Sequence, residues 1–209
     1  MIETKNITKS YTSGSVVTPV LHEINLTVPS GEFLAIMGKS GAGKSTLLYQ
    51  MSLLDIPTSG KIILDGTDTE KFSEKERTDF RLRRLGYVFQ DYALLPELSA
   101  IENVMLPLLM LGLSKKEAIN KATAALDSVG LAHRHSNRPS QLSGGEQQRV
   151  SIARAVGQTP DILFADEPTA NLDSASSQTV IEVMSNLHKK QGQTIVMVTH
   201  EREYALYAD

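Results

Sequence analysis

One segment, Gly38-Lys39-Ser40-Gly41-Ala42-Gly43-Lys44-Ser45, matches the pattern G-x-x-x-x-G-K-[ST], which is typical of a strand–loop–helix unit. An apolar run from Phe33 to Met37 precedes it and predicts a buried strand, while Thr46 to Leu54 predicts a helix after it. Glycines let the loop turn its N–H groups inward, and the helix start adds a partial positive charge. The sequence therefore predicts a loop that binds nucleotide phosphates, with the Lys44 amine on the β- and γ-phosphates and the Ser45 hydroxyl on Mg²⁺.

Two further apolar runs have the same strand-like character. Ile162 to Ala165 leads into Asp166, and Thr194 to Val198 leads into Thr199 and His200. Short, continuous apolar runs are typical of parallel strands that are buried on both faces. Because open α/β sheets bind ligands beyond the carboxyl ends of their strands, these polar residues are expected beside the phosphate loop.

The rest of the chain predicts two additions to this α/β core. Short segments with glycine and proline punctuation predict a smaller β layer: Ile2 to Thr8, Val20 to Val28 and Lys61 to Leu64. The pattern from about Asp91 to Arg154 is helical and predicts an inserted helical subdomain, with a long amphipathic stretch from Lys115 to Val129. Ala175 to Gln191 predicts another helix of the core.

Composition narrows the class of protein. The 209 residues are 41% hydrophobic and 22% charged, which is ordinary for a soluble globular domain. The net charge of -3 gives no general attraction to nucleic acid or anionic lipid. The N-terminus lacks a signal-peptide pattern, and the apolar stretch from Val104 to Leu113 is interrupted by Pro107 and too short to span a bilayer. We therefore expect a cytoplasmic protein that reaches a membrane only through a partner.

Two carboxylates follow the second strand. Asp166 is placed to hold Mg²⁺ through water, and Glu167 to take a proton from the attacking water. Carboxylates are also common where a strand end reaches solvent, and that is the alternative interpretation. Their combination with the phosphate loop favours the catalytic one.

A second candidate anion site is Leu142-Ser143-Gly144-Gly145-Glu146-Gln147. It begins a helix-forming run, so its N–H groups and the Ser143 hydroxyl are available to an anion. Ser143 and Glu146 also fit the S-x-x-E capping box. The two interpretations are compatible, since a capped helix end can itself be the binding surface.

With this motif the chain resembles the nucleotide-binding subunit of ATP-binding cassette (ABC) transporters, whose signature reads LSGGQ or LSGGE. The resemblance covers essentially the whole chain. It implies that Tyr11 stacks on adenine and that Gln90 touches the Mg²⁺ site and senses the membrane partner. It also implies that Asn171-Leu172-Asp173 is the D-loop and that His200 contacts the γ-phosphate. Taken singly, each residue has a plainer interpretation. Tyr11 is then a surface aromatic, Gln90 a polar strand end, Asp173 a helix N-cap and His200 an internally bonded histidine.

The resemblance also implies the fold and the assembly. It indicates one domain over residues 1–209 with a P-loop NTPase (RecA-like) parallel-sheet core, an antiparallel β layer and a helical signature subdomain at 91–154. It implies a head-to-tail homodimer that encloses two ATP molecules. One chain supplies Gly38 to Thr46, Asp166, Glu167 and His200, and the other supplies Ser143, Gly144, Gly145 and Glu146. The implied catalytic residues are Glu167, His200, Lys44, Gln90 and Asp173, and the implied metal ligands are Ser45, Gln90 and Asp166.

Other segments are similar to the MacB, LolD and FtsE group. They are an extended loop from Thr12 to Pro19, the run from Leu54 to Gly60, and Phe89 to Pro96 followed by Glu102-Asn103-Val104. This similarity implies a permease partner, a position at the inner face of the cell membrane, and export or extrusion. An FtsE-like regulatory ATPase that moves no substrate shares every catalytic residue. A soluble ABC protein of DNA repair or translation is less favoured, because no coiled-coil insertion or second cassette is present.

Two features depart from the family pattern. Family members usually continue beyond the position of Asp209 with further strands and a helix, which concerns stability and partner contacts rather than ATP chemistry. The D-loop begins Ala170-Asn171 where many members have Ser-Ala. We attach no functional meaning to the second difference.

Overall fold

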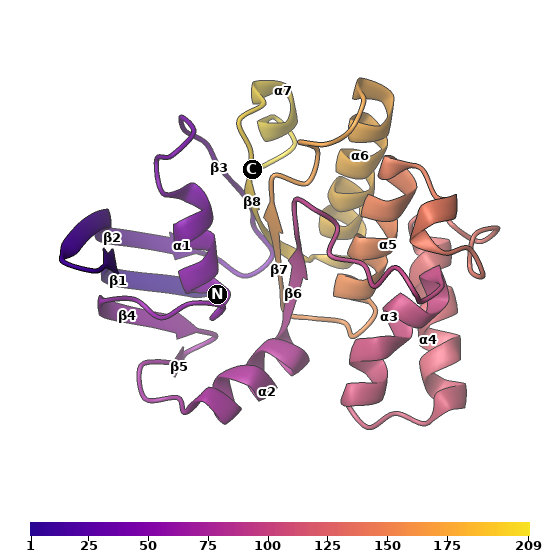
Figure 1. Cartoon of the computed structure of the whole chain (residues 1–209), viewed down its shortest axis with the longest axis horizontal. Coiled ribbons are helices and arrows are strands. Elements are labelled where there is room, and N and C mark those ends of the chain that lie inside the picture. Colours follow the sequence, from indigo (N-terminus) through magenta and orange to yellow (C-terminus); the bar gives the residue numbers. More distant parts are fainter.

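A parallel sheet lies at the centre of the molecule (Figure 1). In the computed structural model, which describes residues 1–209, its strand order is β3-β8-β7-β6. The strands are β3 (Phe33–Ile36), β8 (Thr194–Val198), β7 (Ile162–Asp166) and β6 (Leu85–Val88), and every neighbouring pair is parallel. The three predicted strands are confirmed, and β6 adds a fourth. All four carboxyl ends therefore point to the same edge of the sheet.

The apolar strands are buried on both faces, as their composition predicts. Along β7, Leu163 and Ala165 belong to the hydrophobic core on the helical side of the sheet. Ile162 and Phe164 belong to a second core on the opposite side, beneath the β layer. Because successive side chains of a strand point to opposite faces, a strand between two cores has no polar position until it ends. This is why the first carboxylate appears at Asp166.

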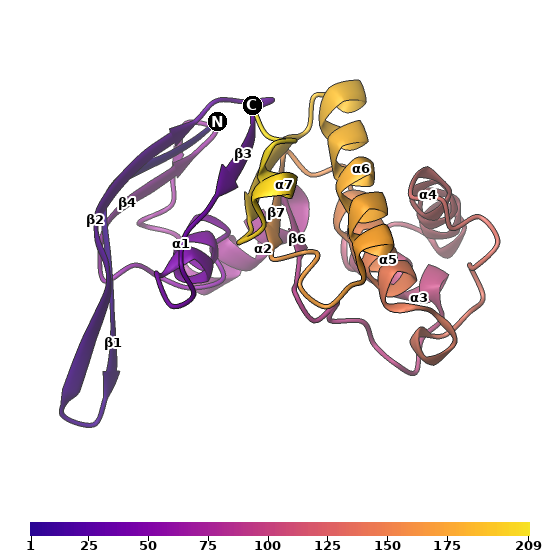
Figure 2. The same ribbon diagram turned by 90° about the horizontal axis from the view of Figure 1, so that it is seen from above.

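The antiparallel sheet covers one side of the core, with strand order β2-β1-β4-β5. Its strands are β1 (Ile2–Ser13), β2 (Val16–Val28), β4 (Ser59–Leu64) and β5 (Thr67–Asp68). The β layer is confirmed, but the expected loop from Thr12 to Pro19 is wrong. β1 and β2 continue as a paired hairpin, with Ser13 opposite Val16, and Figure 2 shows this hairpin projecting beyond the body. The β-branched residues Val16 to Thr18 favour pairing, which the sequence interpretation undervalued.

Helices fill the spaces around the parallel sheet. Their bounds are α1 (Lys44–Met51), α2 (Glu74–Arg84), α3 (Ala100–Met110), α4 (Lys115–Ser128), α5 (Gly144–Val156), α6 (Ser174–Gln191) and α7 (Arg202–Ala205), with a 3₁₀ turn η1 (Pro139–Gln141). None of them combines the length and the apolar character required to cross a bilayer.

The middle of the chain is less helical than the sequence predicts. Residues 91–99 and 129–138 contain no helix, and Tyr92 and Ala93 have positive φ angles of 59° and 49°. The Arg154 guanidinium holds this segment by donating to the backbone carbonyls of Tyr92 (2.9 Å) and Ala93 (2.5 Å). A contact from α5, distant in sequence, therefore decides a conformation that local propensity does not.

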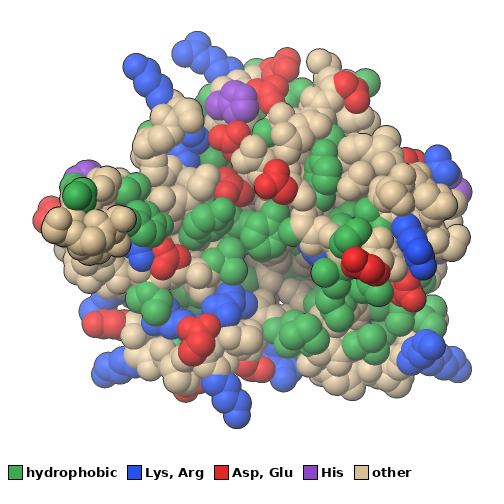
Figure 3. Space-filling model, in the orientation of Figure 1, with side chains coloured by type: hydrophobic (Ala, Val, Ile, Leu, Met, Phe, Trp, Pro, Cys, Tyr) green, Lys and Arg blue, Asp and Glu red, His purple; other side chains and the backbone are tan.

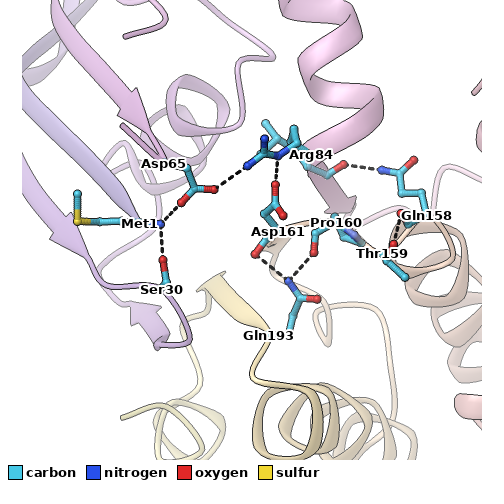
Figure 4. Close-up of polar contacts among 10 residues, drawn as sticks. Met1, Ser30, Asp65, Arg84, Gln158, Thr159, Pro160, Asp161 and Gln193 are labelled. Atoms are coloured by element: carbon cyan, nitrogen blue, oxygen red, sulfur yellow. Dashed lines mark hydrogen bonds and ion pairs between the residues drawn. The ribbon is translucent and has the colours of Figure 1, made fainter. Parts of the chain in front are cut away.

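At the amino ends of the strands, a polar network connects the β layer to the core (Figure 4). The Arg84 guanidinium at the end of α2 donates to Asp65, 3.2 Å away, and also to Asp161 just before β7. The Gln193 amide donates to the carbonyls of Pro160 and Asp161, each at 3.1 Å. The network fixes the sheet at this edge and leaves the carboxyl-end edge free for chemistry.

Candidate functional site

The phosphate loop lies between β3 and α1, as predicted, and its glycines are required by geometry. Gly43 has a φ of 86°, and a Cβ atom there would lie 3.1 Å from the Val20 carbonyl oxygen and 3.0 Å from Val20 Cγ1. Gly43 is also the N-cap of α1, and no side chain caps this helix. The first N–H groups of α1 are thus available to an anion, which also gains from the positive end of the helix dipole.

The Lys44 amine is held over this loop. Lys44 is only 9% exposed, and its Nζ donates to the Lys39 carbonyl oxygen at 3.1 Å. The same amine lies 3.9 Å from Oε1 of Glu167. A buried ammonium with a single distant carboxylate retains capacity for a further anion, such as a phosphate group.

Ser45 and Asp166 form an oxygen-donor pair that suits Mg²⁺. The Ser45 hydroxyl donates to Oδ1 of Asp166 at 2.8 Å, and Asp166 is 5% exposed. Hydroxyl and carboxylate oxygens are ligands that Mg²⁺ prefers, so these residues fit the metal. Gln90, the third predicted ligand, is exposed two residues beyond β6, and only its backbone carbonyl is bonded, to the Asn171 amide at 3.2 Å.

Burial raises the pKa of Asp166, the Ser45 hydrogen bond opposes this, and the nearby Glu167 charge raises the pKa further. The folded state therefore binds this proton more tightly than the unfolded state does. Stability from this group is present at low pH and is lost as pH rises from about 4, the ordinary Asp value, through the raised pKa. An ionised Asp166 without metal is a cost to folding at neutral pH.

Asp166→Asn is consequently expected to stabilise the metal-free protein at pH 7, because the amide is uncharged and still accepts from Ser45. The melting temperature should rise by roughly 2–4 °C, the shift that about 1 kcal/mol produces in a chain of this size. Thermal unfolding in EDTA from pH 5 to 8 measures this, and the gain should grow with pH. Stabilisation by added MgATP should be lost. A variant less stable than wild type at pH 7 would contradict this account of Asp166.

Glu167 is held in a strained backbone conformation beside His200. Its φ is 43°, its N–H donates to the Val198 carbonyl at 3.0 Å, and its Oε2 lies 3.1 Å from Nδ1 of His200. Left-handed φ is uncommon outside glycine and is often found at functional sites. The turn points the Glu167 carboxylate toward the Lys44 amine rather than back along the strand.

Lys44, Glu167 and His200 line an open cavity of about 720 Å³ together with part of the phosphate loop. Arg202 also lines it, and sequence reasoning missed this residue. The sequence feature that could have predicted Arg202 is its position two residues after His200, just beyond the end of a predicted strand. The cavity thus combines a loop of N–H groups, the three cations Lys39, Lys44 and Arg202, and one carboxylate, a composition suited to a polyphosphate and a hydrolytic water.

The signature segment is a capped helix end, as one interpretation predicts. The Ser143 hydroxyl accepts from the Glu146 N–H at 3.3 Å, and the Glu146 carboxylate accepts from the Ser143 N–H at 2.8 Å. A Cβ atom on Gly145 would lie 2.8 Å from the Ser176 side chain, and one on Gly144 would lie 2.9 Å from the Tyr92 hydroxyl. No hydrogen bond or ion pair joins this segment to the phosphate loop, so one chain does not bring the two anion sites together.

Two other predicted residues have partners outside the cavity. Tyr11 on β1 is 43% exposed, and its hydroxyl donates to Asp55 at 3.2 Å. Asp173 is the N-cap of α6 and accepts from the Ser176 N–H at 2.9 Å. The plainer interpretation of Asp173 as a helix cap is therefore seen in the structure, while its catalytic role stays a prediction.

Comparison with known proteins gives a consistent result. The family described as ABC transporter matches residues 21–170. The chain is 48% identical to the lipoprotein-releasing system ATP-binding protein LolD of Geobacter metallireducens, over 99% of this chain and 92% of that protein. It is 47% identical to the macrolide export ATP-binding/permease protein MacB of Syntrophobacter fumaroxidans, over 98% of this chain but 29% of that longer protein. Among solved structures, the ATP-binding cassette MJ0796, in a dimeric post-hydrolysis state with ADP and Pi, has a TM-score of 0.92 at 39% identity, covering all of this chain and 91% of that one.

Proposed function

Since the chain belongs to the ABC transporter family, we propose that it powers a separate membrane permease of the LolD and MacB kind. Its part in this family is that of an ATP-binding subunit, which hydrolyses ATP with Mg²⁺ to drive transport. One observation carries the catalytic assignment. The phosphate loop, the Ser45–Asp166 pair and the Glu167–His200 pair converge on one edge of the parallel sheet.

In the proposed mechanism, the phosphate loop and the Lys44 amine bind the β- and γ-phosphates. Ser45 and Asp166 would hold Mg²⁺, with Gln90 as a third ligand, and the bound metal would neutralise phosphate charge. Glu167 accepts a proton from the water that attacks the γ-phosphorus, and His200 keeps the carboxylate in position. The bond from the γ-phosphorus to its bridging oxygen breaks, and ADP leaves with that oxygen.

The proposed active unit is a head-to-tail homodimer. Ser143, Gly144, Gly145 and Glu146 present a helix N-terminus and make no hydrogen bond or ion pair with their own phosphate loop. A second copy supplies them to the γ-phosphate in this proposal, and Asp173 lies at the dimer contact. The dimeric state of MJ0796 supports this assembly. Tyr11, exposed on β1, stacks on the adenine ring.

A groove of about 340 Å³ between α2, β6, α3 and α5 is the proposed docking site for the permease. Figure 3 shows hydrophobic side chains gathered around a hollow between α2 and α3. On α3, Leu106 is 39% exposed and Met110 is 63% exposed, and both line the groove. Exposed apolar clusters of this kind mark protein interfaces. In MacB the permease is part of the same polypeptide as the ATP-binding part. We therefore propose that a permease segment binds in this groove.

Arg154 provides a connection from this groove toward the nucleotide site. It lines the groove and also holds the carbonyls of Tyr92 and Ala93, just beyond Gln90. We propose that residues 91–154 move as a helical subdomain during the ATP cycle. Closure of the dimer on ATP then shifts the residues that line the groove.

A charge placed in the groove should uncouple the protein from its permease. Met110→Glu is expected to weaken permease binding by at least about tenfold, the effect of losing one well-buried interface contact. ATP binding by the isolated subunit should remain unchanged. Copurification with the detergent-solubilised permease, identified by mass spectrometry, measures the loss. Ile119→Glu is the matched control, because Ile119 is 37% exposed on α4 outside the groove. Equal permease retention by both variants would place the interface elsewhere.

A regulatory ATPase that signals through a membrane protein without transport uses the same residues. The relatives named for lipoprotein release and macrolide export favour transport. Reconstituting the chain with its permease in vesicles and following solute movement on addition of MgATP distinguishes the two. The chain would lie at the inner face of the cell membrane, held there by the permease.

A further inference from the structure

Tyr49 lies on the side of α1 that faces the proposed metal site. It follows Ser45 by four residues, and residues four apart are neighbours on one helix face. The Ser45 hydroxyl is 2.8 Å from Oδ1 of Asp166, so Tyr49 lies on the helix face that is turned toward this carboxylate. Asp166 also lies among the groups that raise the pKa of Tyr49, after the larger effect of burial.

Tyr87 approaches Asp166 from the neighbouring strand. It is paired in register with Phe164 on β7, two residues before Asp166, and side chains two apart share one face of a sheet. Its ring centroid lies 6.1 Å from that of Tyr49 and 4.4 Å from that of Phe89. The two phenol rings thus lie next to each other, on the face of the sheet to which the Asp166 side chain also belongs.

The Tyr87 hydroxyl is the unusual feature of this cluster. Its oxygen is buried and has no hydrogen-bond partner in the protein. Leaving a buried hydroxyl without a partner costs stability, and a phenylalanine would pack here without that cost. A phenol hydroxyl keeps its proton at neutral pH, so the buried Tyr87 hydroxyl is available as a hydrogen-bond donor.

We propose that Tyr49 and Tyr87 are positioning residues for the Asp166 carboxylate, whose hydroxyls orient it toward Mg²⁺ once the metal is bound. The inference rests on the proposed role of Asp166 as a metal-binding residue. Carboxylates that bind metals are usually held by hydrogen bonds, which fix the oxygen that faces the metal. The competing explanation is that the two rings serve only to pack α1 against β6.

Tyr49→Phe and Tyr87→Phe separate these explanations, because phenylalanine keeps the ring and removes the hydroxyl. The measurement is the affinity for the non-hydrolysable analogue β,γ-imido-ATP with saturating Mg²⁺ and again in EDTA. The ratio of the two affinities reports the coupling between metal and nucleotide. We expect the ratio to fall by about tenfold or more in the double variant, the usual effect of removing such a partner, while the affinity in EDTA stays within about twofold.

Tyr207→Phe is the matched control, since its hydroxyl bonds Gln178, 2.6 Å away and outside the cluster. Wild-type metal dependence in the double variant, with or without a change in melting temperature, would overturn the inference and leave the proposed function standing. A wild-type protein whose nucleotide affinity is indifferent to Mg²⁺ would instead contradict the proposed function itself.

Discussion

Glu167→Gln lowers the rate of ATP hydrolysis by about 10²- to 10⁴-fold, the typical contribution of a general base. The amide cannot accept the proton from the attacking water, but it is nearly the same size as the carboxylate. Glu167 lies 3.9 Å from the Lys44 amine, so the substitution also removes a negative charge from the site where phosphate binds. Nucleotide affinity is therefore expected to be retained or increased, and phosphate release under saturating MgATP measures the loss.

The same variant should accumulate a dimer with bound ATP, because hydrolysis no longer opens it. Light scattering with saturating MgATP follows the change in mass. Glu203→Gln is the matched control, an exposed carboxylate on α7 that lines no part of the cavity. Unchanged hydrolysis in Glu167→Gln would remove Glu167 from the mechanism. A monomer at every MgATP concentration would count against the sandwich dimer.

Two inactive variants should restore activity to each other when mixed. Lys44→Ala disables the phosphate loop and Ser143→Arg disables the signature helix end, each by about 10²-fold or more, the effect of removing a group that stabilises the transition state. A mixed dimer contains one site built from the intact loop of one chain and the intact signature of the other. Equal mixing gives at most about a quarter of the wild-type sites, as expected for a symmetric dimer with two shared sites.

Phosphate release by each variant alone and by the mixture measures this recovery. Melting temperatures of the separate variants verify that both are folded, since Ser143 also caps α5. A mixture no more active than the average of its components would mean that each chain completes its own site. Mixing Lys44→Ala with Glu167→Gln is the internal control, because both changes affect the same half and no intact site forms.

The proposed Mg²⁺ ligands Ser45 and Asp166 show what could be predicted from the sequence pattern. The sequence placed Asp166 after an apolar strand and Ser45 after a glycine loop, and the structure brings their oxygens within 2.8 Å. The meeting was predictable because parallel strands deliver their carboxyl ends to one edge. The same rule anticipated His200 near Glu167, and they lie 3.1 Å apart.

Other features depend on contacts that no local pattern contains. The fold brings Arg202 to the cavity through the course of the chain after β8. It brings Tyr49 next to Tyr87 through the rotation of α1 and the register of β6 with β7. The hairpin from β1 to β2 continues to Ser13 and Val16 because backbone pairing satisfies its polar groups, even though its side chains are exposed.

The amino-acid pattern thus predicts the phosphate loop, three of the four parallel strands and the family resemblance. These are properties of residues that are adjacent in the chain, where glycine freedom and hydrophobic periodicity act directly. The direction in which Glu167 turns and the burial of the Tyr87 hydroxyl without a partner become visible only in the folded chain. These two features depend on side-chain direction and burial, which are set by residues distant in sequence, whereas the absence of a hydrogen bond or ion pair between Ser143 and its own phosphate loop agrees with what the resemblance implies.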